Sequence, residues 1–288
     1  MHAILTKDRF NDAKDYLFRS GRSLEQQLFR YHFEDGDAEP VLHELATHQM
    51  PDGGFRNMGE GNNDVSSPIG TTCAFQHLAK LRVQAEHPVV QRGINYLISV
   101  YDSSCDAWPQ KADDSRYLEK ELDLHWGNPG AEIVGYLWKY QELVPDAFLE
   151  HVTALAIKRF YKLPLPVPGF ADLCYVRLAQ WIPKISIQKR IYKKVTEGVH
   201  QNLELNHKRW HTCYFIKPYW YALTPDSPLH NTLEDEIHSC LDFDIEMQET
   251  DGSAYLSFEV NGDALRTWKS IWTLESLIVL NNYCRIEQ

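Results

Sequence analysis

The spacing of hydrophobic residues predicts a chain of helices in which two kinds alternate. Residues 89–101 are typical of the first kind, because Val90, Ile94 and Leu97 recur at intervals of three and four among polar positions. Such a helix buries one face. Residues 264–284 are typical of the second kind, since apolar side chains are expected on almost every side of that helix. Neighbouring helices must enclose it.

The same alternation recurs along the whole chain and predicts twelve helices. One-faced helices are expected at 7–19, 37–50, 87–101, 145–161, 184–202 and 230–247, and more apolar helices at 21–33, 68–84, 128–143, 171–182, 211–223 and 264–284. No run alternates with the period of two that strands require. We therefore predict an all-α fold, an α6/α6 toroid in which six outer and six inner helices form a double ring. Residues 1–288 would make a single domain.

Two of the more apolar segments carry helix start signals. Ser67-Pro68 and Asn128-Pro129 each combine a capping side chain with a proline at the first helical position. We expect helices to begin at both places.

A short motif occurs at the ends of two predicted outer helices. Residues 49–55 read Gln-Met-Pro-Asp-Gly-Gly-Phe, and residues 248–255 read Gln-Glu-Thr-Asp-Gly-Ser-Ala-Tyr. Weaker copies lie at 106–109 and 169–170. The motif resembles the repeat of squalene–hopene cyclases and of protein prenyltransferase β-subunits, and the resemblance extends over roughly the whole chain. In that family the glutamine and the aromatic residue tie the end of an outer helix to the next inner helix.

This resemblance implies a function as well as a fold. We expect a cytoplasmic terpenoid-cyclase-like or prenyltransferase-like protein that acts on, or binds, an isoprenoid or another apolar substrate in a central cavity. Fold alone does not fix chemistry. An α6/α6 carbohydrate-active enzyme (a glycoside hydrolase or lyase) and a non-catalytic binding or scaffold toroid are the alternatives.

The predicted helix order places a site at one end of the barrel. The long connections all run from an outer to an inner helix, so the inner helices begin at this mouth and favour an anionic group there. Arg266 and Lys269 are candidates to assist. Aromatic side chains on or near the inner helices suit an apolar or cationic ligand, and the candidates to contact it are Trp126, Tyr175, Tyr214 and Trp268.

One zinc ion is the cofactor that the resemblance suggests. Protein prenyltransferases hold zinc with an Asp-x-Cys pair and a later histidine. Asp172 and Cys174 match that order, His211 matches more loosely, and Cys213 is an alternative thiolate. Carboxylate, thiolate and imidazole are all ligands that zinc accepts. The same residues are also compatible with a helix cap and small core thiols.

Two further sets of acidic residues are candidates for acid–base chemistry. Asp64 and Glu132, on the starts of different inner helices, suit a carboxylate pair with His125 as a base or proton relay. Residues 242–246 (Asp-Phe-Asp-Ile-Glu) resemble the acidic signature of class II terpene cyclases. They close an outer helix, however, and we expect Asp242 and Glu246 to share a solvated face.

Composition excludes several classes of partner. The formal net charge of −11 and the absence of a Lys/Arg cluster argue against nucleic-acid binding. We expect no transmembrane segment and no signal peptide, because no apolar stretch has the required length or place. The six cysteines are scattered without a CxxC pair, which favours reduced thiols in a cytoplasm over a disulfide framework.

Overall fold

The structure is a computed structural model that describes residues 2–59, 64–109 and 126–287. Within these ranges the chain is all-helical, with eleven α-helices, four short 3-10 helices and only isolated β-bridges. Each of these helices is too short or too polar to cross a membrane. The chain divides into two compact units. Unit 1 combines Met1–Glu44 with Leu203–Gln288, unit 2 is Leu45–Asn202, and α3 (Ala38–His48) runs across the boundary.

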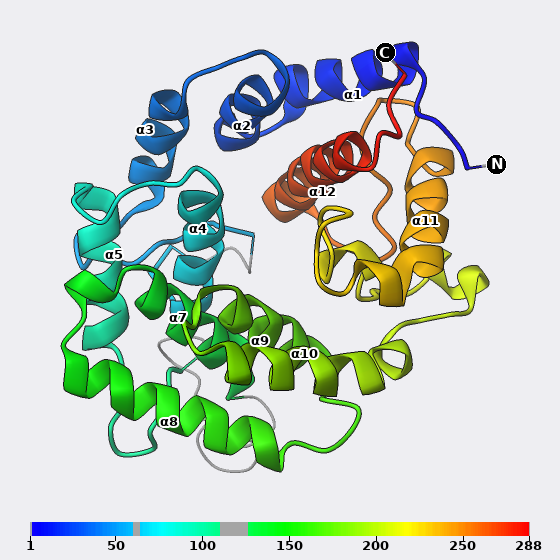
Figure 1. Ribbon diagram of the computed structural model, residues 1–288. Helices are drawn as coiled ribbons and strands as arrows, with labels where there is room; N and C mark the ends of the chain where they lie inside the picture. The colour runs from blue at the N-terminus through cyan, green and yellow to red at the C-terminus, as the bar shows by residue number, and fades with distance from the viewer. Residues whose placement is uncertain (1, 60–63, 110–125, 288) are drawn as a thin grey trace. The chain divides into compact units, whose positions relative to one another are not determined.

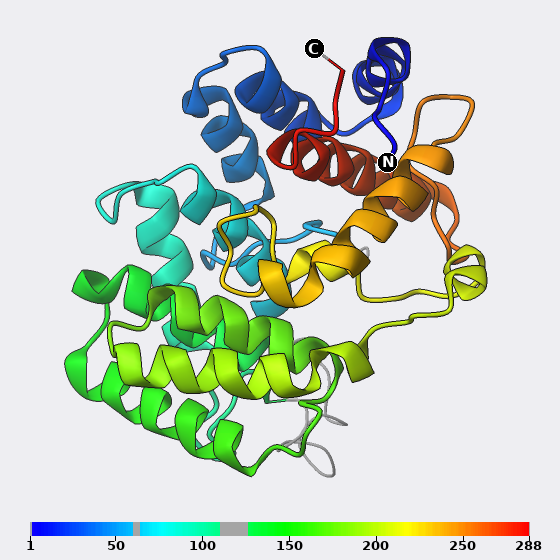
Figure 2. The same ribbon diagram turned by 45° about the vertical axis from the view of Figure 1, so that its right-hand side comes forward.

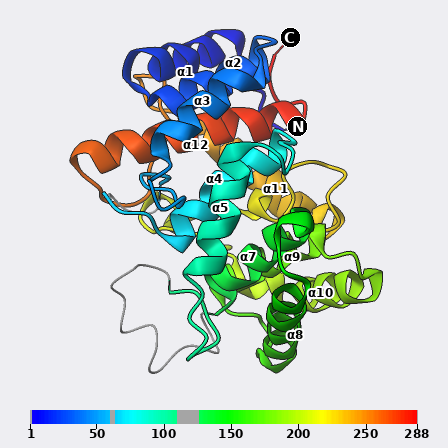
Figure 3. The same cartoon turned by 90° about the vertical axis from the view of Figure 1, so that its left-hand side faces the viewer.

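Unit 2 has two rows of helices. In the inner row, α7 contacts both α4 and α9, and in the outer row α5 packs on α4, α8 on α7 and α10 on α9 (Figures 1 and 3). The inner helices are α4 (Pro68–Lys80), α7 (Gly127–Lys139) and α9 (Gly169–Trp181); the outer helices are α5 (Pro88–Ser99), α8 (Asp146–Lys162) and α10 (Ile185–Gly198); the 3-10 turns η2 (Gln141–Leu143) and η3 (Val199–Asn202) follow α7 and α10.

Unit 1 is built around one long apolar helix. That helix, α12, contacts α1 and α2 from the beginning of the sequence and α11 from the end (Figure 2). From Ser270 to Leu280 none of its residues is exposed. The α-helices are α1 (Lys7–Ser20), α2 (Ser23–Phe33), α11 (His230–Glu246) and α12 (Gly262–Asn282), and the 3-10 helices are η4 (His207–His211) and η5 (Pro218–Trp220).

The all-helical fold and eleven of the twelve predicted helices are confirmed within the described residues. The predicted alternation is also present as a difference in burial. Nearly every residue of α7 from Gly127 to Leu137 is buried, whereas α10 buries only Ile191, Val195 and Gly198. For this pair the hydrophobic period correctly predicts which helix is enclosed and which one covers it. It fails for another pair, because α2, predicted as the more apolar kind, buries four of its eleven residues, whereas α5 buries six of twelve.

The prediction of a helix over residues 211–223 is wrong. In that segment the structure has the last residue of η4, the 3-10 helix η5 and otherwise a non-helical connection. The reason is Pro218, which lacks the N–H that a helix requires and disfavours the helical region at the preceding residue. Lys217 is accordingly extended, with φ −70° and ψ 126°.

The two predicted helix starts differ in their capping. Ser67 caps α4 as expected, because its hydroxyl accepts a hydrogen bond from the Gly70 N–H (3.0 Å) and Pro68 is the first helical residue. Asn128 has a non-helical backbone inside α7, and its amide oxygen accepts a hydrogen bond from the Cys174 thiol (3.7 Å). It is thus a link to α9.

The two glutamine motifs form the same turn. In the first copy the Gln49 side chain donates to the Gly53 carbonyl, and in the second Gln248 donates to the Gly252 carbonyl (2.9 and 3.0 Å). A threonine of the following helix then accepts from the turn: Thr71 from the Phe55 N–H and Thr273 from the Ala254 N–H. The residue whose N–H binds the threonine is thus alanine in the second copy and phenylalanine in the first.

The glutamines also reach farther than the resemblance implies. Gln49 donates to the carbonyl of Val89 in the first turn of α5, and Gln248 donates to that of Arg9 in the first turn of α1 (both 2.9 Å). Each glutamine therefore connects the helix that ends at its turn to another helix, α3 to α5 and α11 to α1, and the threonine supplies the link to the helix that follows the turn. The role is structural in both copies.

Candidate functional site

A buried polar cluster lies on the inner helices of unit 2 and is centred on Glu132. The carboxylate accepts hydrogen bonds from Gln76 of α4 (2.9 Å), from Tyr136 of α7 (3.0 Å) and from Arg177 of α9 (2.7 Å). The Cys174 thiol lies 3.7 Å from Oε2 of the same carboxylate, the oxygen that also accepts from Arg177. Glu132 is 2% exposed, so its charge is neutralised inside the protein by Arg177.

This arrangement holds the neighbouring groups in their protonated forms. Burial, together with the Glu132 carboxylate, raises the pKa of the Tyr136 hydroxyl and of the Cys174 thiol well above their usual values. A neutral, buried thiol is a poor nucleophile and a poor metal ligand. The cluster connects α4, α7 and α9, and its geometry is that of a structural ion pair with satisfied hydrogen bonds.

A second group of side chains, in unit 1, consists of aromatic rings in mutual contact. Tyr214 and Phe258 lie with their ring centroids 5.2 Å apart, and Phe258 in turn contacts Trp268 (5.8 Å) and Trp272 (5.3 Å). Trp220 completes it, 6.4 Å from Tyr214. We call Tyr214, Trp220, Phe258, Trp268 and Trp272 the aromatic cluster. Tyr214 is 42% exposed while Trp272 is 4% exposed, so the cluster extends from the surface into the core.

A buried ion pair lies beside the aromatic cluster. The Lys217 ammonium contacts Asp244 at 2.5 Å and lies 4.7 Å from the centroid of the Trp272 ring. Burial acts to lower the pKa of Lys217, but the Asp244 carboxylate outweighs it and the pKa is raised overall. Tyr219 donates to the same carboxylate (2.9 Å). The Lys217 ammonium therefore lies against Trp272, the most buried ring of the aromatic cluster.

The acidic segment 242–246 does not lie wholly on a solvated face. Glu246 is exposed, but Asp244 points inward to Lys217, and Asp242 accepts from the N–H of Ala3 and from Arg285. Asp244 is a salt-bridge partner of Lys217, and the buried residues of α11 explain why. Ile237, Cys240 and Leu241 define a stripe that reaches position 244 one turn later.

The three predicted zinc ligands lie in different surroundings. Asp172 accepts a hydrogen bond from the Asn202 amide (2.6 Å), whereas Cys174 faces Asn128 and Glu132. Positions two apart on a helix do not share a face. His211 belongs to unit 1, where it is exposed and its ring contacts Phe243 and Tyr255. Among the residues that the structure describes, no three His, Cys, Asp or Glu side chains are grouped as metal ligands.

The carboxylate pair is also not assembled as a catalytic dyad. Asp64 is exposed, Glu132 is buried in its cluster, and His125 lies outside the described residues. Trp126 donates to the Asp106 carbonyl (2.7 Å) and Tyr175 to the Ala156 carbonyl (3.1 Å), and both rings are buried. These two aromatic residues pack the core of unit 2.

The two predicted cations have backbone or hydroxyl partners. Arg266 donates to the carbonyls of Ser20 and Gly21, and Lys269 donates to the Ser253 hydroxyl (2.9 Å). Lys269 therefore ties α12 to the second glutamine turn. Of the predicted substrate-binding residues, Tyr214 and Trp268 are the two that the structure brings together, through Phe258.

The structure also reveals groups that the sequence did not single out. Arg177 and Gln76 are the partners of Glu132, and Lys217 is the partner of Asp244. The signal for Lys217 was available, because a lysine within the apolar run Tyr-Phe-Ile-Lys-Pro-Tyr-Trp requires a buried counter-charge. The partner of Glu132 had no comparable signal.

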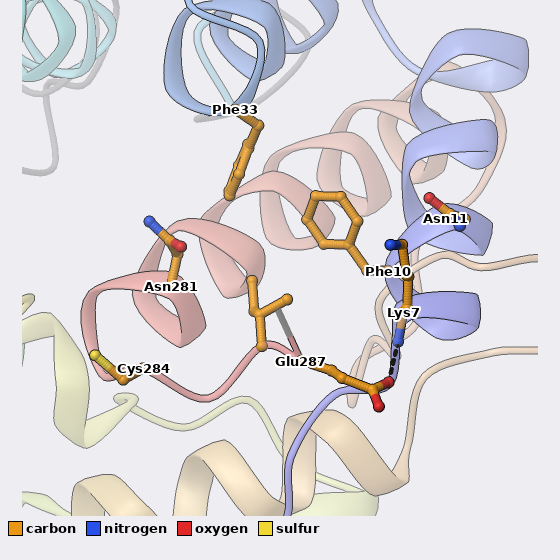
Figure 4. Close-up of a pocket in the computed structure, with 8 residues that line it drawn as sticks. Lys7, Phe10, Asn11, Phe33, Asn281, Cys284 and Glu287 are labelled. Carbon is orange, nitrogen blue, oxygen red and sulfur yellow. Dashed lines mark hydrogen bonds between the residues drawn. The ribbon is translucent and has the colours of Figure 1, made fainter.

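A separate pocket of about 370 Å³ opens in unit 1 between α1, α2 and the end of α12 (Figure 4). Phe10 and Phe33 supply its apolar surface, with their ring centroids 5.4 Å apart. Lys7, Asn11, Asn281 and Glu287 form a polar rim. Its size suits a small ligand, but its polar groups do not converge on one point in the way a specific site requires.

Comparisons with known proteins add no relative to this description. No family model matches the chain, and neither the curated proteins nor the solved structures contain a match.

Proposed function

We propose that this chain is a double-layered helical toroid that binds an isoprenoid, or another elongated apolar molecule, against the aromatic cluster of unit 1. The observation that carries the proposal is the cluster itself. Tyr214, Phe258 and Trp268 present aromatic surface that unit 1 leaves partly exposed, while Trp272 anchors that surface in the core. Partly exposed aromatic groups of this kind bind apolar ligands by burying area on both partners.

The toroid part of the proposal is supported by the two glutamine turns. The turn after α3 is joined to α5, the next outer helix along the chain. The turn after α11 is joined in the same way to α1, at the other end of the sequence. In a closed ring of repeats, the first helix of the chain must complete the last repeat. The bond from the turn after α11 to α1 is of this kind. The two rows of helices in unit 2 supply the inner and outer layers.

The Lys217 ammonium beside the aromatic cluster affects whether the cluster can hold a neutral ligand or a carbocation. The Lys217 ammonium, paired with Asp244, already lies over the Trp272 ring at 4.7 Å from its centroid, so that face of the ring is not available to a carbocation. The cluster therefore favours a neutral hydrocarbon chain over a cationic intermediate of cyclisation. We propose binding of a neutral apolar chain in preference to cyclase chemistry at this surface.

Binding of prenyl diphosphates tests the proposal. We expect the wild type to bind at least one of geranyl, farnesyl and geranylgeranyl diphosphate, measured by tryptophan fluorescence and by thermal shift. Trp268→Ala is expected to weaken binding about ten-fold or more, because it removes roughly 1.5–3 kcal/mol of apolar contact. Tyr214→Ala should act in the same direction, since its ring forms the exposed end of the cluster.

The matched control is Tyr161→Ala. Tyr161 is a tyrosine of unit 2 that is 47% exposed and lies outside the aromatic cluster, so its removal should leave binding unchanged. Absence of any binding or thermal shift with all three ligands would contradict the proposal and favour a scaffold. Hydrolysis of a glycoside would favour the carbohydrate-active alternative, although the pairing of Glu132 with Arg177 does not support it.

Metal analysis decides whether the zinc site exists. We expect less than about a tenth of a zinc ion per chain in protein purified without chelator, because Asp172 and Cys174 face different partners and the thiol is held protonated. A content near one zinc per chain that is lost in Cys174→Ser would instead establish the site. Cys240→Ser is the control, since that thiol is buried in unit 1.

A further inference from the structure

Two short segments from opposite ends of the sequence are joined in unit 1 by backbone hydrogen bonds. The Leu5 N–H donates to the Arg285 carbonyl (2.8 Å), and the Glu287 N–H donates to the Leu5 carbonyl (2.9 Å). The Lys7 N–H also donates to the Glu287 carboxylate (2.9 Å; Figure 4). We call residues 2–7 and 284–287 the latch. These bonds are few, so the latch depends on the side chains that hold it.

Arg285 is the side chain that joins both latch segments to α11. It is 4% exposed, and its guanidinium donates to the Ala3 carbonyl (2.6 Å), to the Asp242 carboxylate and to the ring of His238. The Ala3 N–H donates to the same carboxylate of Asp242 (2.8 Å). Because a guanidinium has five donors and no acceptor, each of its partners must accept.

The contact with His238 therefore fixes the protonation state of that histidine. Arg285 Nη1 lies 3.0 Å from His238 Nδ1, so Nδ1 must carry a lone pair and the ring must be neutral. Protonation would place a second N–H directly against the guanidinium. The His2 ring stacks on His238 at 4.2 Å with an interplanar angle of 17°, which brings a further titratable ring to the same place.

The other charged groups around His238 do not reverse the preference for a neutral His238 ring. Burial, then His2, Arg285 and His230, lower the pKa of His238, and Glu234 on the same helix opposes them by raising it. Tyr283 contacts the ring edge-on from the end of α12. Asp242 lies 3.7 Å from His2 Nδ1 and pairs with Arg285. The balance holds the pKa below its ordinary value.

We propose that His238 makes the latch sensitive to acid: protonation of its ring expels the Arg285 guanidinium and releases residues 2–7 from residues 284–287. The closed latch binds a proton on His238 more weakly than the open latch does. The free energy that favours the closed latch over the open latch is therefore largest above the ordinary histidine pKa of about 6.5, and it decreases as the pH drops below that value. Opening also removes Lys7 and Glu287 from the rim of the pocket, so access to that pocket would follow the pH.

Hydrogen exchange tests the latch directly. Protection of the Leu5 and Glu287 amides, corrected for the intrinsic exchange rate, is expected to fall up to about ten-fold per pH unit below pH 6.5, because opening takes up one proton. Amides in the middle of α12 should keep their protection over the same range. In His238→Asn, whose amide oxygen replaces the Nδ1 acceptor without titrating, the fall should disappear.

His230→Asn is the matched control on the same helix. The hydroxyl of Tyr283 donates to the Ala222 carbonyl (2.7 Å) and can accept from His230 in either protonation state of the ring. That variant should keep most of the acid response of the wild type, because His230 has the weakest effect of the groups that act on the pKa of His238. An unchanged acid response in His238→Asn would overturn the proposal. If that variant does not fold, a histidine pKa at or above 6.5 for His238 in the wild type, measured by NMR, would overturn it equally.

Discussion

Replacement of Arg177 by leucine is expected to lower the free energy of unfolding by about 3–5 kcal/mol, because it leaves a buried carboxylate without its counter-charge. Glu132 is 2% exposed, and its remaining partners, Gln76 and Tyr136, are neutral. Urea unfolding followed by far-UV circular dichroism measures the loss.

The double variant Glu132→Gln/Arg177→Leu separates the missing pair from lost packing. A neutral glutamine at 132 keeps the hydrogen-bonding groups without the charge, so the double variant should recover most of the stability that Arg177→Leu loses. Arg92→Leu is the control, since Arg92 donates from an exposed position to the Met50 carbonyl and should matter little. Equal losses in the single and double variants would show that the ion pair is not the cause.

Substitution of Gly252 by alanine is expected to cost about 3 kcal/mol or more. Gly252 has a φ of +88°, and a Cβ atom there would lie 2.0 Å from the Asp12 carbonyl oxygen in α1. The backbone would have to move, and the hydrogen bond from Gln248 to the Gly252 carbonyl would be disturbed with it. Thermal unfolding of the variant measures the effect.

Gly262→Ala provides the comparison for that substitution. Gly262 also has a positive φ, +61°, but nothing lies within 4 Å of the Cβ that alanine would add. Its cost should be limited to the backbone strain of about 1–2 kcal/mol. Similar losses at both positions would mean that the close approach of α1 to the turn has no energetic weight.

Most of the helices could be predicted from the sequence because the hydrophobic period is a local property. The segment 211–223 shows the limit. Its aromatic residues suggested an inner helix, but Pro218 prevents one, and the same aromatic residues pack from a 3-10 turn and an extended segment. Tyr214, predicted to contact a ligand, lies 5.2 Å from Phe258 in the aromatic cluster, and the predicted secondary structure around it was wrong.

The polar partners could not be predicted in the same way. Glu132 and Arg177 are separated by 45 positions and meet only because α7 packs closely on α9. Asp172 and Cys174 looked like a pair of ligands because they are neighbours in sequence, yet their side chains leave α9 in different directions. The rotation of each helix about its own axis decides which side chains meet across two packed helices. The hydrophobic period of the sequence fixes this rotation only approximately.

The glutamine turn of α11 has a consequence for how the chain reaches its native state. Gln248 bonds to Arg9 across 239 positions, and α12 packs on α1 and α2. Closing so long a loop is entropically costly, and contacts of this separation form late. During synthesis, residues 45–202 can therefore become compact while α1 and α2 still lack the helix that covers them. Buried apolar side chains of these two helices, such as Leu17 and Leu24, would then lack part of their cover, so the newly made amino-terminal helices are where a chaperone has the most to protect.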